Sequence, residues 1–307
     1  MLNSKFEDRS TSNPLVSIHI VTYNQVHFVH ETLQSVLNQE YKNIEIIVAD
    51  DGSTDGTAEV ILEYGSKYPG KVIPLVGGPN LGITKNCNRG LEYCRGNYVA
   101  FLGGDDVMAA EKLQIQVAYM EANPDVLVSY HNLEVFDSVS GRTTHLLNRT
   151  GSYSGGCSGY IRRGCVNGGS STMVRTACMP KSGFDLSMPV ASDWFFWVQI
   201  LAETDGNIGY IDQILGRYRR HTQNVTSQSS PFSLQGTRDC ITACSRIIFD
   251  YPSFAPSATY RLGTLLRSQR TSDNYRLRLI SSLRISYQFK TIGLFLVNLL
   301  SFGKVRL

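Results

Sequence analysis

The sequence predicts an α/β protein, with a mostly parallel sheet flanked by helices and a helical C-terminal extension. Short β-rich runs alternate with longer segments in which apolar residues recur every three or four positions. The runs are apolar almost throughout, which is typical of parallel strands buried on both faces. Several of them end in polar loops rich in Asp and Gly, at the strand edge where open α/β sheets bind ligands.

The first part of the chain alternates regularly. We expect strands at 15–21 (LVSIHIV), 44–49 (IEIIVA), 71–76 and 98–102, the last continuing into Gly103-Gly104-Asp105-Asp106. Amphipathic helices are expected at 26–39, from 57 to about 64, and at 84–94. This βαβαβαβ order requires right-handed crossovers and parallel pairing.

The second part is less regular. A helix is expected at 109–121 and strands at 126–130 and 208–215, whereas the Gly- and Ser-rich stretch 141–169 is expected to form a long functional loop. The segment 192–201 (SDWFFWVQIL) is apolar on nearly all sides, which predicts a buried helix with Asp193 in its first turn.

Composition excludes several classes. The 307 residues are 42% hydrophobic and 18% charged, which argues against general disorder and against a multi-span membrane protein. Seven cysteines without a CxxC pair favour a reduced compartment over a disulfide scaffold or a zinc site. Residues 1–14 are polar and are expected to be a flexible tail without an export signal.

Charge is distributed unevenly along the chain. Residues 251–307 contain nine Lys or Arg and one acid, Asp273, a net charge of +8 in a chain whose total is +3. The nearly apolar stretch 291–302 is too short to cross a bilayer as a helix, which needs about 20 residues. We expect this basic tail to lie on an anionic membrane surface, with packing onto the body as the alternative.

Four motifs follow one another: Thr22-Tyr23-Asn24, DDGSTDGT at 50–57, GGDD at 103–106 and Ser192-Asp193-Trp194. In order and spacing they resemble the family 2 glycosyltransferases, which have the GT-A fold, over residues 16–226. The resemblance implies a GT-A domain at 15–230, with a nucleotide-binding half (15–107) and an acceptor-binding half (108–230), before a basic helical extension at 231–307.

The resemblance also implies an activity. Such enzymes move a sugar from a nucleoside diphosphate, here expected to be UDP, to an acceptor hydroxyl with inversion. A hexosyltransferase acting on a lipid-linked oligosaccharide of a surface polysaccharide (O-antigen or capsule type) is expected, in the cytoplasm at the inner face of the cell membrane. No nucleic-acid partner is expected, and the oligomeric state is open.

The donor site follows by position. Tyr23 matches the base-stacking aromatic, and Asp51 or its neighbour Asp50 matches the carboxylate that accepts from the pyrimidine imide. The other expected donor contacts are at Val21, Thr22, Gly82, Lys85, Asn86, Gly104 and Asp105. A core tyrosine and a helix-capping aspartate are the structural alternatives.

Asp105 and Asp106 match the metal-binding DxD-type element. Asp106 is expected to bind Mn²⁺ or Mg²⁺ directly, Asp105 to face the ribose or the metal, and His221 to lie near the diphosphate and the metal. Gly103 stands where many relatives have an aspartate, which leaves two acids instead of three.

Asp193 matches the catalytic base, and Trp194, Gly169 and Ser170 are expected to line the acceptor site. Relatives commonly have Glu-Asp where this chain has Ser192-Asp193. Because of Ser192 and Gly103, a catalytically weakened nucleotide-sugar-binding or scaffold module is the alternative. A dinucleotide oxidoreductase ranks low because no GxGxxG turn follows the first strand.

Overall fold

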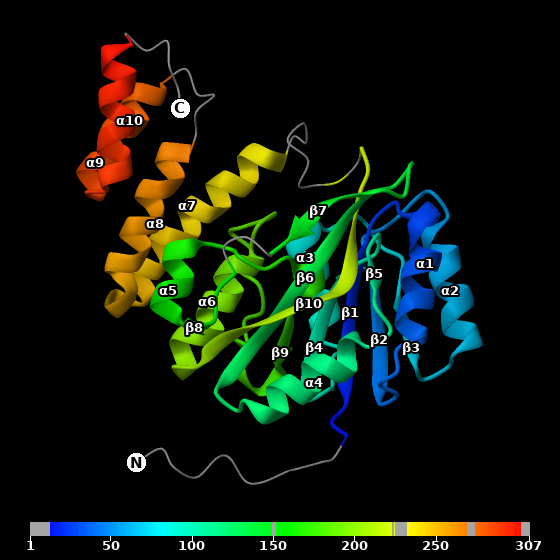
Figure 1. Ribbon diagram of the computed structural model, residues 1–307. Helices are drawn as coiled ribbons and strands as arrows, with labels where there is room; N and C mark the ends of the chain where they lie inside the picture. Colours follow the sequence, from blue (N-terminus) through cyan, green and yellow to red (C-terminus); the bar gives the residue numbers. More distant parts are fainter. Residues whose placement is uncertain (1–12, 149–151, 223, 225–231, 269–273, 302–307) are drawn as a thin grey trace.

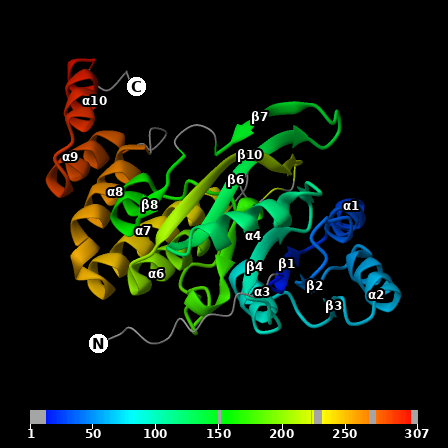
Figure 2. The same ribbon diagram turned by 60° about the horizontal axis from the view of Figure 1, so that its bottom comes forward.

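The computed structural model describes residues 13–148, 152–222, 224, 232–268 and 274–301. Ten strands of the described chain form one sheet, and helices cover both of its faces (Figures 1 and 2). The expected α/β class, with a central sheet flanked by helices and helices at the C-terminus, is confirmed. Most of the tail expected at 1–14 and the domain boundary expected at 230 lie outside the described residues.

One half of the sheet is parallel, in the order β3-β2-β1-β4. The register pairs Thr22 with Asp50 and Val21 with Gly103, so the loops after β1, β2 and β4 leave the sheet at the same edge. The strands are β1 (Val16–Thr22), β2 (Ile44–Asp50), β3 (Val72–Leu75) and β4 (Tyr98–Gly103), and the connecting helices are α1 (Val26–Leu37), α2 (Thr57–Lys67) and α3 (Ile83–Leu91).

The other half continues from β4 in the order β9-β6-β10-β5. β9 is antiparallel to both β4 and β6, whereas β10 runs parallel to β6. Its strands are β5 (Val107–Met108), β6 (Val126–Asp137), β7 (Thr143–Leu147), β8 (Gly155–Gly156), β9 (Met173–Arg175) and β10 (Asn207–Arg220). Its helices are α4 (Lys112–Ala122), α5 (Cys157–Arg163) and α6 (Asp193–Thr204), with short 3₁₀ turns η1 (Gly169–Ser171) and η2 (Thr176–Cys178).

Three expectations for this half are corrected. β6 and β10 are much longer than the apolar runs that predicted them, because their pairing continues past the core to Asp137 and Arg220. The predicted 141–169 loop contains β7, β8 and α5, where Cys157, Tyr160 and Ile161 pack into the core despite the polar composition around them.

Two apolar clusters lie on opposite faces of the sheet. One packs α1, α2 and α4 against it, through Leu33, Ile61 and Leu113 among others. The other contains the aromatic residues of α6 together with residues of α5, α7 and α8. The predicted buried helix is thus confirmed, and the C-terminal extension shares its core.

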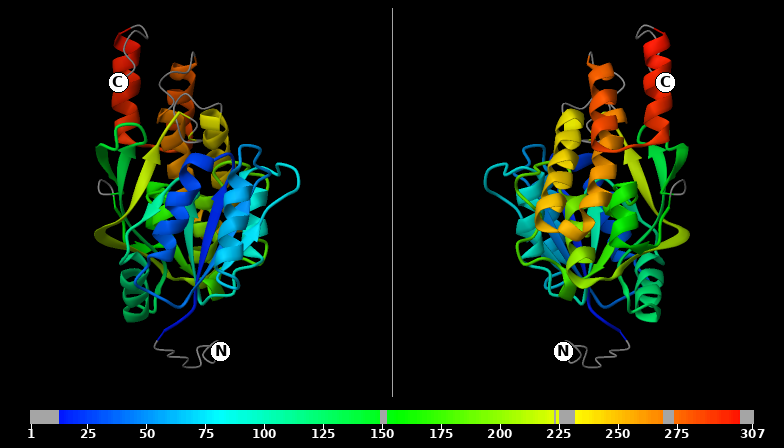
Figure 3. Two further views of the ribbon diagram at one scale, coloured as in Figure 1. Left: turned by 90° about the vertical axis from the view of Figure 1, so that its right-hand side faces the viewer. Right: turned by 90° about the vertical axis from the view of Figure 1, so that its left-hand side faces the viewer.

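The extension has four α-helices in its described part. They are α7 (Phe232–Asp250), α8 (Ala255–Ser268), α9 (Tyr275–Ile285) and α10 (Phe289–Leu300), with a 3₁₀ turn η3 (Pro252–Phe254) after α7. α7 and α8 lie against α6 and α5, whereas α9 and α10 project beyond the sheet (Figure 3). Within the described residues, none of the helices is long and apolar enough to cross a membrane.

His19 makes folding sensitive to acid. It lies buried in β1 next to Phe101, and among the described residues no well-aligned hydrogen bond reaches its ring nitrogens, although the Cys87 backbone partly offsets the effect of burial on its pKa. Burial lowers the pKa of His19 to about 4. Below the pKa of an unfolded histidine, about 6.5, the unfolded chain therefore binds a proton that the folded chain does not.

We expect the free energy of unfolding to be fully retained above pH 6.5 and to fall as the pH drops toward 4, by up to about 1.4 kcal/mol per pH unit for this group. Urea unfolding of wild type and His19→Leu at pH 7, 6 and 5 measures the effect, and the variant should show the shallower pH dependence. His27→Leu, at an exposed position on α1, is the control. Equal pH dependence in all three proteins would contradict the prediction.

Candidate functional site

The loop after β1 presents Tyr23 at the edge of the sheet. Its side chain is 48% exposed, although it directly follows the buried Thr22. Asn24 adopts a left-handed conformation and ties this loop to the loop after β2, donating its backbone N–H to the Ser53 hydroxyl at 2.8 Å and accepting from the Thr54 N–H at 2.9 Å. Tyr23 is therefore an exposed aromatic ring on a braced loop, and the core alternative for it is excluded.

Asp50 and Asp51 are both buried and both organise loops. Asp50 accepts from the N–H and the hydroxyl of Ser53. Asp51 accepts from the N–H groups of Leu81 at 2.7 Å and Gly82 at 3.0 Å, where α3 begins. The carboxylate predicted to contact a nucleotide base thus also holds the start of α3.

The residues at α3 that are predicted to contact the nucleotide sugar differ in their exposure. Lys85 is exposed on the first turn of α3, and Gly82 precedes that helix. Asn86 is buried and donates to the carbonyl of Ala49 at 2.8 Å. The expectation that Asn86 contacts the nucleotide sugar is corrected, because its side-chain amide is directed to β2 and the residue is only 2% exposed.

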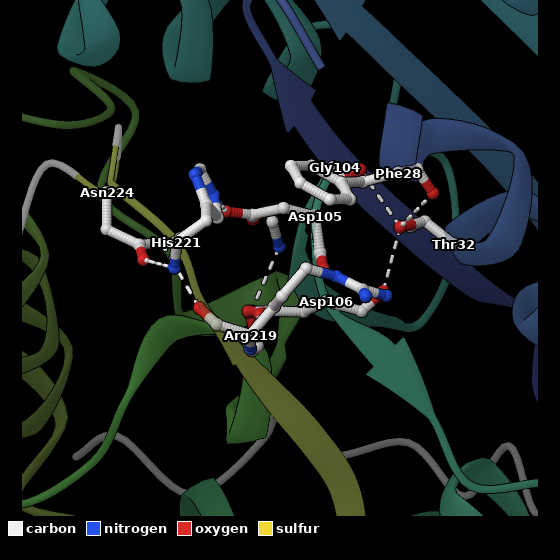
Figure 4. A network of polar contacts seen from close by, with 10 residues as sticks. Phe28, Thr32, Gly104, Asp105, Asp106, Arg219, His221 and Asn224 are labelled. Carbon is white, nitrogen blue, oxygen red and sulfur yellow. Dashed lines mark hydrogen bonds and ion pairs between the residues drawn. The ribbon is translucent and has the colours of Figure 1, made fainter. Parts of the chain in front are cut away.

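Asp105 and His221 form the accessible polar pair of the site (Figure 4). The His221 Nε2 atom lies 2.8 Å from Asp105 Oδ2, and both side chains keep some exposure, 9% and 13%. Asn224 donates to the same carboxylate oxygen at 3.2 Å and accepts from the His221 N–H at 2.6 Å. The two residues predicted to lie near the metal and the diphosphate are thus in contact, although 116 positions separate them.

Asp106 is enclosed. Its Oδ1 accepts from the Arg219 N–H at 2.9 Å, and its Oδ2 accepts from the Ser170 hydroxyl. Burial raises the pKa of Asp106, and the charge of Asp105 raises it further. Asp106 stays a predicted metal ligand, although each of its oxygens already accepts one hydrogen bond inside the protein, and Asp105 is the more accessible of the two carboxylates.

These side chains fit a divalent cation that takes some of its ligands from the protein and the others from a bound substrate. Mg²⁺ and Mn²⁺ accept carboxylate oxygen, and Mg²⁺ sites in proteins often use one or two carboxylates and complete the shell with substrate phosphates and water. Asp105 and His221 supply two ligands at the accessible end of the network. No cluster of three or more His, Cys, Asp or Glu residues able to hold a metal is found in the described part of the chain, so substrate oxygens would have to supply the rest.

Ser170 and Gly169 have different surroundings. Ser170 is buried, accepts from the Gly103 N–H at 3.0 Å and contacts Asp106, so the expected acceptor contact is corrected for its side chain. The buried Lys112 donates to the Ser170 carbonyl at 3.0 Å, and burial lowers the pKa of Lys112 to about 7. Gly169 faces open space.

Asp193 begins α6. Its side chain is half-buried and accepts from the N–H of Trp194 at 2.8 Å, and burial raises the pKa of its carboxyl. Trp194 is only 1% exposed and belongs to the core. The expectation that the Trp194 ring borders the acceptor is corrected, because the ring presents no face to a sugar.

Asp51 and Asp193 both lie near the start of α3. Asp51 accepts from the Gly82 N–H at 3.0 Å, and the hydroxyl of Ser192, directly before Asp193, lies 3.2 Å from the Thr84 hydroxyl. Burial, together with the charges of Asp193 and Asp51, raises the pKa of the Cys87 thiol to about 12. The carboxylate at the nucleotide side and the carboxylate at the start of α6 are therefore both close to the same end of α3.

A cavity of about 460 Å³ lies on the acceptor half, next to Gly169. Its lining combines amide, thiol and guanidinium groups with apolar side chains: Leu147, Asn148, Arg163, Cys165, Val166, Asn167 and Gly168. The expected functional region near 167–171 thus has a hollow beside it.

Several residues of this network were not predicted from the sequence. Arg219 donates from Nε to the Asp105 carbonyl at 2.7 Å and stacks over Phe28, and Thr32 lies within hydrogen-bond distance of the Gly104 and Asp106 carbonyls (Figure 4). The Arg-Arg-His run at 219–221 marked His221 but not the buried role of Arg219. Nothing in the local sequence marked Thr32 or Asn224.

Residues 17–179 match the model of glycosyl transferase family 2. The putative glycosyltransferase EpsE of Bacillus subtilis (strain 168) is 32% identical over 136 residues, which are 44% of this chain and 49% of EpsE. This chain is thus similar to about half the length of that relative. The UDP-Glc:alpha-D-GlcNAc-diphosphoundecaprenol beta-1,3-glucosyltransferase WfgD of Escherichia coli is 29% identical over 216 residues, covering 69% of this chain and 80% of WfgD.

Solved structures share the fold. S. aureus TarS 1-349 in complex with UDP-GlcNAc superposes with a TM-score of 0.67 and 18% identity, over 95% of this chain and 87% of the TarS chain. The mannosyltransferase PcManGT from Pyrobaculum calidifontis, in complex with GDP-Man and Mn²⁺, gives a TM-score of 0.63 and 17% identity, over 96% and 82%.

Proposed function

The chain belongs to glycosyl transferase family 2, and on that premise we propose that it is an inverting hexosyltransferase that uses a nucleoside diphosphate sugar, with UDP as the expected nucleotide. The observation that supports this best is the arrangement of three acidic groups around the strand edge. Asp51 binds the N–H of Gly82 at the start of α3, Ser192 next to Asp193 lies 3.2 Å from Thr84 on the same helix, and Asp105 with His221 forms the accessible polar pair.

Asp193 is proposed as the general base. Its carboxylate would take the proton of the acceptor hydroxyl while the hydroxyl oxygen forms a bond to the anomeric carbon. The bond from that carbon to the diphosphate breaks, and its electron pair leaves with the nucleoside diphosphate. A pKa raised by burial makes the carboxylate a better proton acceptor.

The donor would be held by the loops at the strand edge. Tyr23 offers an exposed aromatic face for the base, and Val21, Thr22, Gly82, Lys85 and Gly104 surround the same edge. Asp105, Asp106 and His221 are the residues that would hold Mn²⁺ or Mg²⁺ next to the diphosphate. A bound divalent cation supplies charge neutralisation of the leaving group.

A lipid-linked saccharide is the proposed acceptor, in the synthesis of an O-antigen- or capsule-type polysaccharide. The relative WfgD is named for transfer to a diphosphoundecaprenol-linked sugar, and its similarity to this chain supports this class of acceptor. The cavity at Arg163 and Gly168 lies on the acceptor half and combines charged, amide and apolar groups. An acceptor of this kind is presented at a membrane surface.

The C-terminal helices support a peripheral position on that membrane. In α10 the buried side chains are the polar Thr291 and Asn298, whereas Leu300 is 77% exposed. Tyr287, between α9 and α10, and Phe289, the first residue of α10, are 89% and 94% exposed. We call α9, α10 and the residues between them the hairpin. Its apolar side therefore faces outward, which is the orientation of a helix that binds a lipid surface.

Polar contacts hold the hairpin in this orientation. Arg267 donates to Gln288 and, at 2.8 Å, to the Thr291 hydroxyl, and Arg276 donates to Asn298 at 3.2 Å. β1 enters from the bottom of Figure 1, so the carboxyl ends of the parallel strands point to the top, the end at which α9 and α10 project. A membrane that binds this pair of helices would thus lie on the side of the protein that carries the proposed active site. The proposed membrane surface is the inner face of the cell membrane.

The first prediction concerns Asp193. Asp193→Asn removes the proton acceptor with little change in shape, so we expect kcat to fall about 10²–10⁴-fold while the Kd for the nucleotide sugar stays within twofold. Sugar transfer and calorimetric donor binding measure the two quantities. Asp205→Asn, at the exposed far end of α6, is the matched control. Near-normal turnover of Asp193→Asn would exclude Asp193 as the base, and donor binding without transfer by the wild type would favour the scaffold alternative.

The second prediction concerns the cation. We expect EDTA to abolish transfer and Mn²⁺ to restore it, and Asp105→Ala to weaken Mn²⁺-dependent UDP binding at least tenfold, because Asp105 is the accessible carboxylate. Calorimetry with UDP, with and without Mn²⁺, measures the effect, and Glu63→Ala at an exposed position of α2 is the control. Activity that is unchanged by the chelator would argue against a metal role.

The third prediction concerns the membrane. We expect the full chain to float with vesicles that contain anionic phosphatidylglycerol, and to float less with pure phosphatidylcholine or at high salt. Replacing Tyr287 and Phe289 together by Ser should reduce flotation severalfold, whereas Phe249→Ser, an equally polar change at an exposed aromatic of α7, should not. Loss of flotation in neither or in both variants would contradict the assignment of this surface.

A further inference from the structure

The segment that leads into α6 is held from two directions. On one side α3 binds it: Asn88 exchanges hydrogen bonds with the backbone of Phe184 at 2.7 and 2.9 Å, and the Thr84 hydroxyl donates to the Met188 carbonyl at 2.7 Å. This side belongs to the nucleotide-binding half, where Asp51 fixes the start of α3.

On the other side the segment is held by α7, through the buried carboxylate of Asp239 and through an ion pair of Arg246 with Asp185 at 2.9 Å. One oxygen of Asp239 accepts from the N–H groups of Val190 at 2.8 Å and Ala191 at 2.9 Å. The other oxygen accepts from the Gln235 amide, one turn earlier on α7, at 2.8 Å. Asp239 is therefore a fully engaged buried acid that lies in the C-terminal extension.

The contact made by Asp239 lies close to Asp193 in the chain. Val190 and Ala191 are the third and second residues before Asp193, so the contact fixes the backbone directly ahead of the first turn of α6. Hydrogen bonds to an ionised acceptor are roughly twice as strong as neutral ones, and a negative charge is favoured at a helix N-terminus.

We propose that Asp239 is a positioning residue for glycosyl transfer, which holds Val190 and Ala191 so that the Asp193 carboxylate is directed at the acceptor hydroxyl. The C-terminal extension then forms part of the catalytic unit as well as the proposed membrane contact. The inference rests on the proposed role of Asp193. A carboxylate displaced by about 1 Å can lose about two orders of magnitude in rate, whereas donor binding, which uses other loops, is unaffected.

The test is a double-mutant cycle on the full-length chain. Asp239→Ala should lower kcat at least tenfold and leave the donor KM within twofold. Asp239→Asn should retain most of the activity, because its amide oxygen still accepts both N–H groups and Gln235 can turn its own amide to match. In the Asp193→Asn background, Asp239→Ala should cost less than twofold further, because the group that it positions is already gone.

Two further measurements separate positioning from general damage. Hydrogen exchange of the peptide that contains residues 184–192 should become faster in Asp239→Ala, while peptides of β1 and β2 keep their protection. Ser245→Ala, at an exposed position of the same helix where the hydroxyl binds only the Ile241 carbonyl, should change neither exchange nor kcat. If Asp239→Ala does not fold, Gln235→Ala, which removes one of the three bonds to Asp239, should still lower kcat in wild type and not in Asp193→Asn.

The outcomes are distinguishable. Normal kcat in Asp239→Ala, or an equal further loss in the Asp193→Asn background, would overturn the positioning role while the proposed function stands. Unchanged exchange at 184–192 would overturn it without reference to activity. Full activity of Asp193→Asn would instead overturn the base assignment on which the inference rests.

Discussion

The buried carboxylate of Asp106 is the constraint on which the site depends. It joins the end of β4 to the backbone of β10 through the Arg219 N–H, and to η1 through the Ser170 hydroxyl. A buried acid is tolerated only where its oxygens are engaged, so these three segments must meet in one arrangement. That arrangement places Asp105 and His221, which follow Gly104 and Arg220 in the chain, in contact with each other.

Polar contacts also fix the position of a carboxylate at α6, whereas apolar packing buries the helix. Trp194, Phe195, Phe196 and Trp197 bury the helix against the sheet, and this fixes its axis. Packing alone leaves the first turn less constrained than hydrogen bonds do, because apolar contacts are non-directional. The backbone before Asp193 is instead held by Thr84 from one half of the molecule and by Asp239 from the extension. The two halves and the extension therefore converge on one short segment.

Prediction from the sequence succeeded where local pattern carries the information. The parallel strands, the buried helix and the C-terminal helices all follow from apolar periodicity, and the contact between Asp105 and His221 agrees with their predicted place at one site. Prediction was wrong for α5 and Trp194, because burial there is decided by residues far away in the chain, and for β7, because its pairing with β6 is not visible in its own polar sequence. Ser170 and Asn86 carried the right residue types, but a sequence does not show whether a polar group faces a ligand or another part of the protein.

Gly103 is more than a missing acid. A Cβ atom at this position would lie 2.8 Å from Asp105 Oδ1 and 3.3 Å from Asp106 Oδ2. A side chain here and the present conformation of Asp105 therefore occupy overlapping space, and a larger residue would require the carboxylate of Asp105 to turn away from where it now lies. A side chain at position 103 and the present conformation of the Asp105 side chain therefore exclude each other. An aspartate at position 103 would change the arrangement of the carboxylates at the end of β4 instead of adding a third carboxylate to the present arrangement.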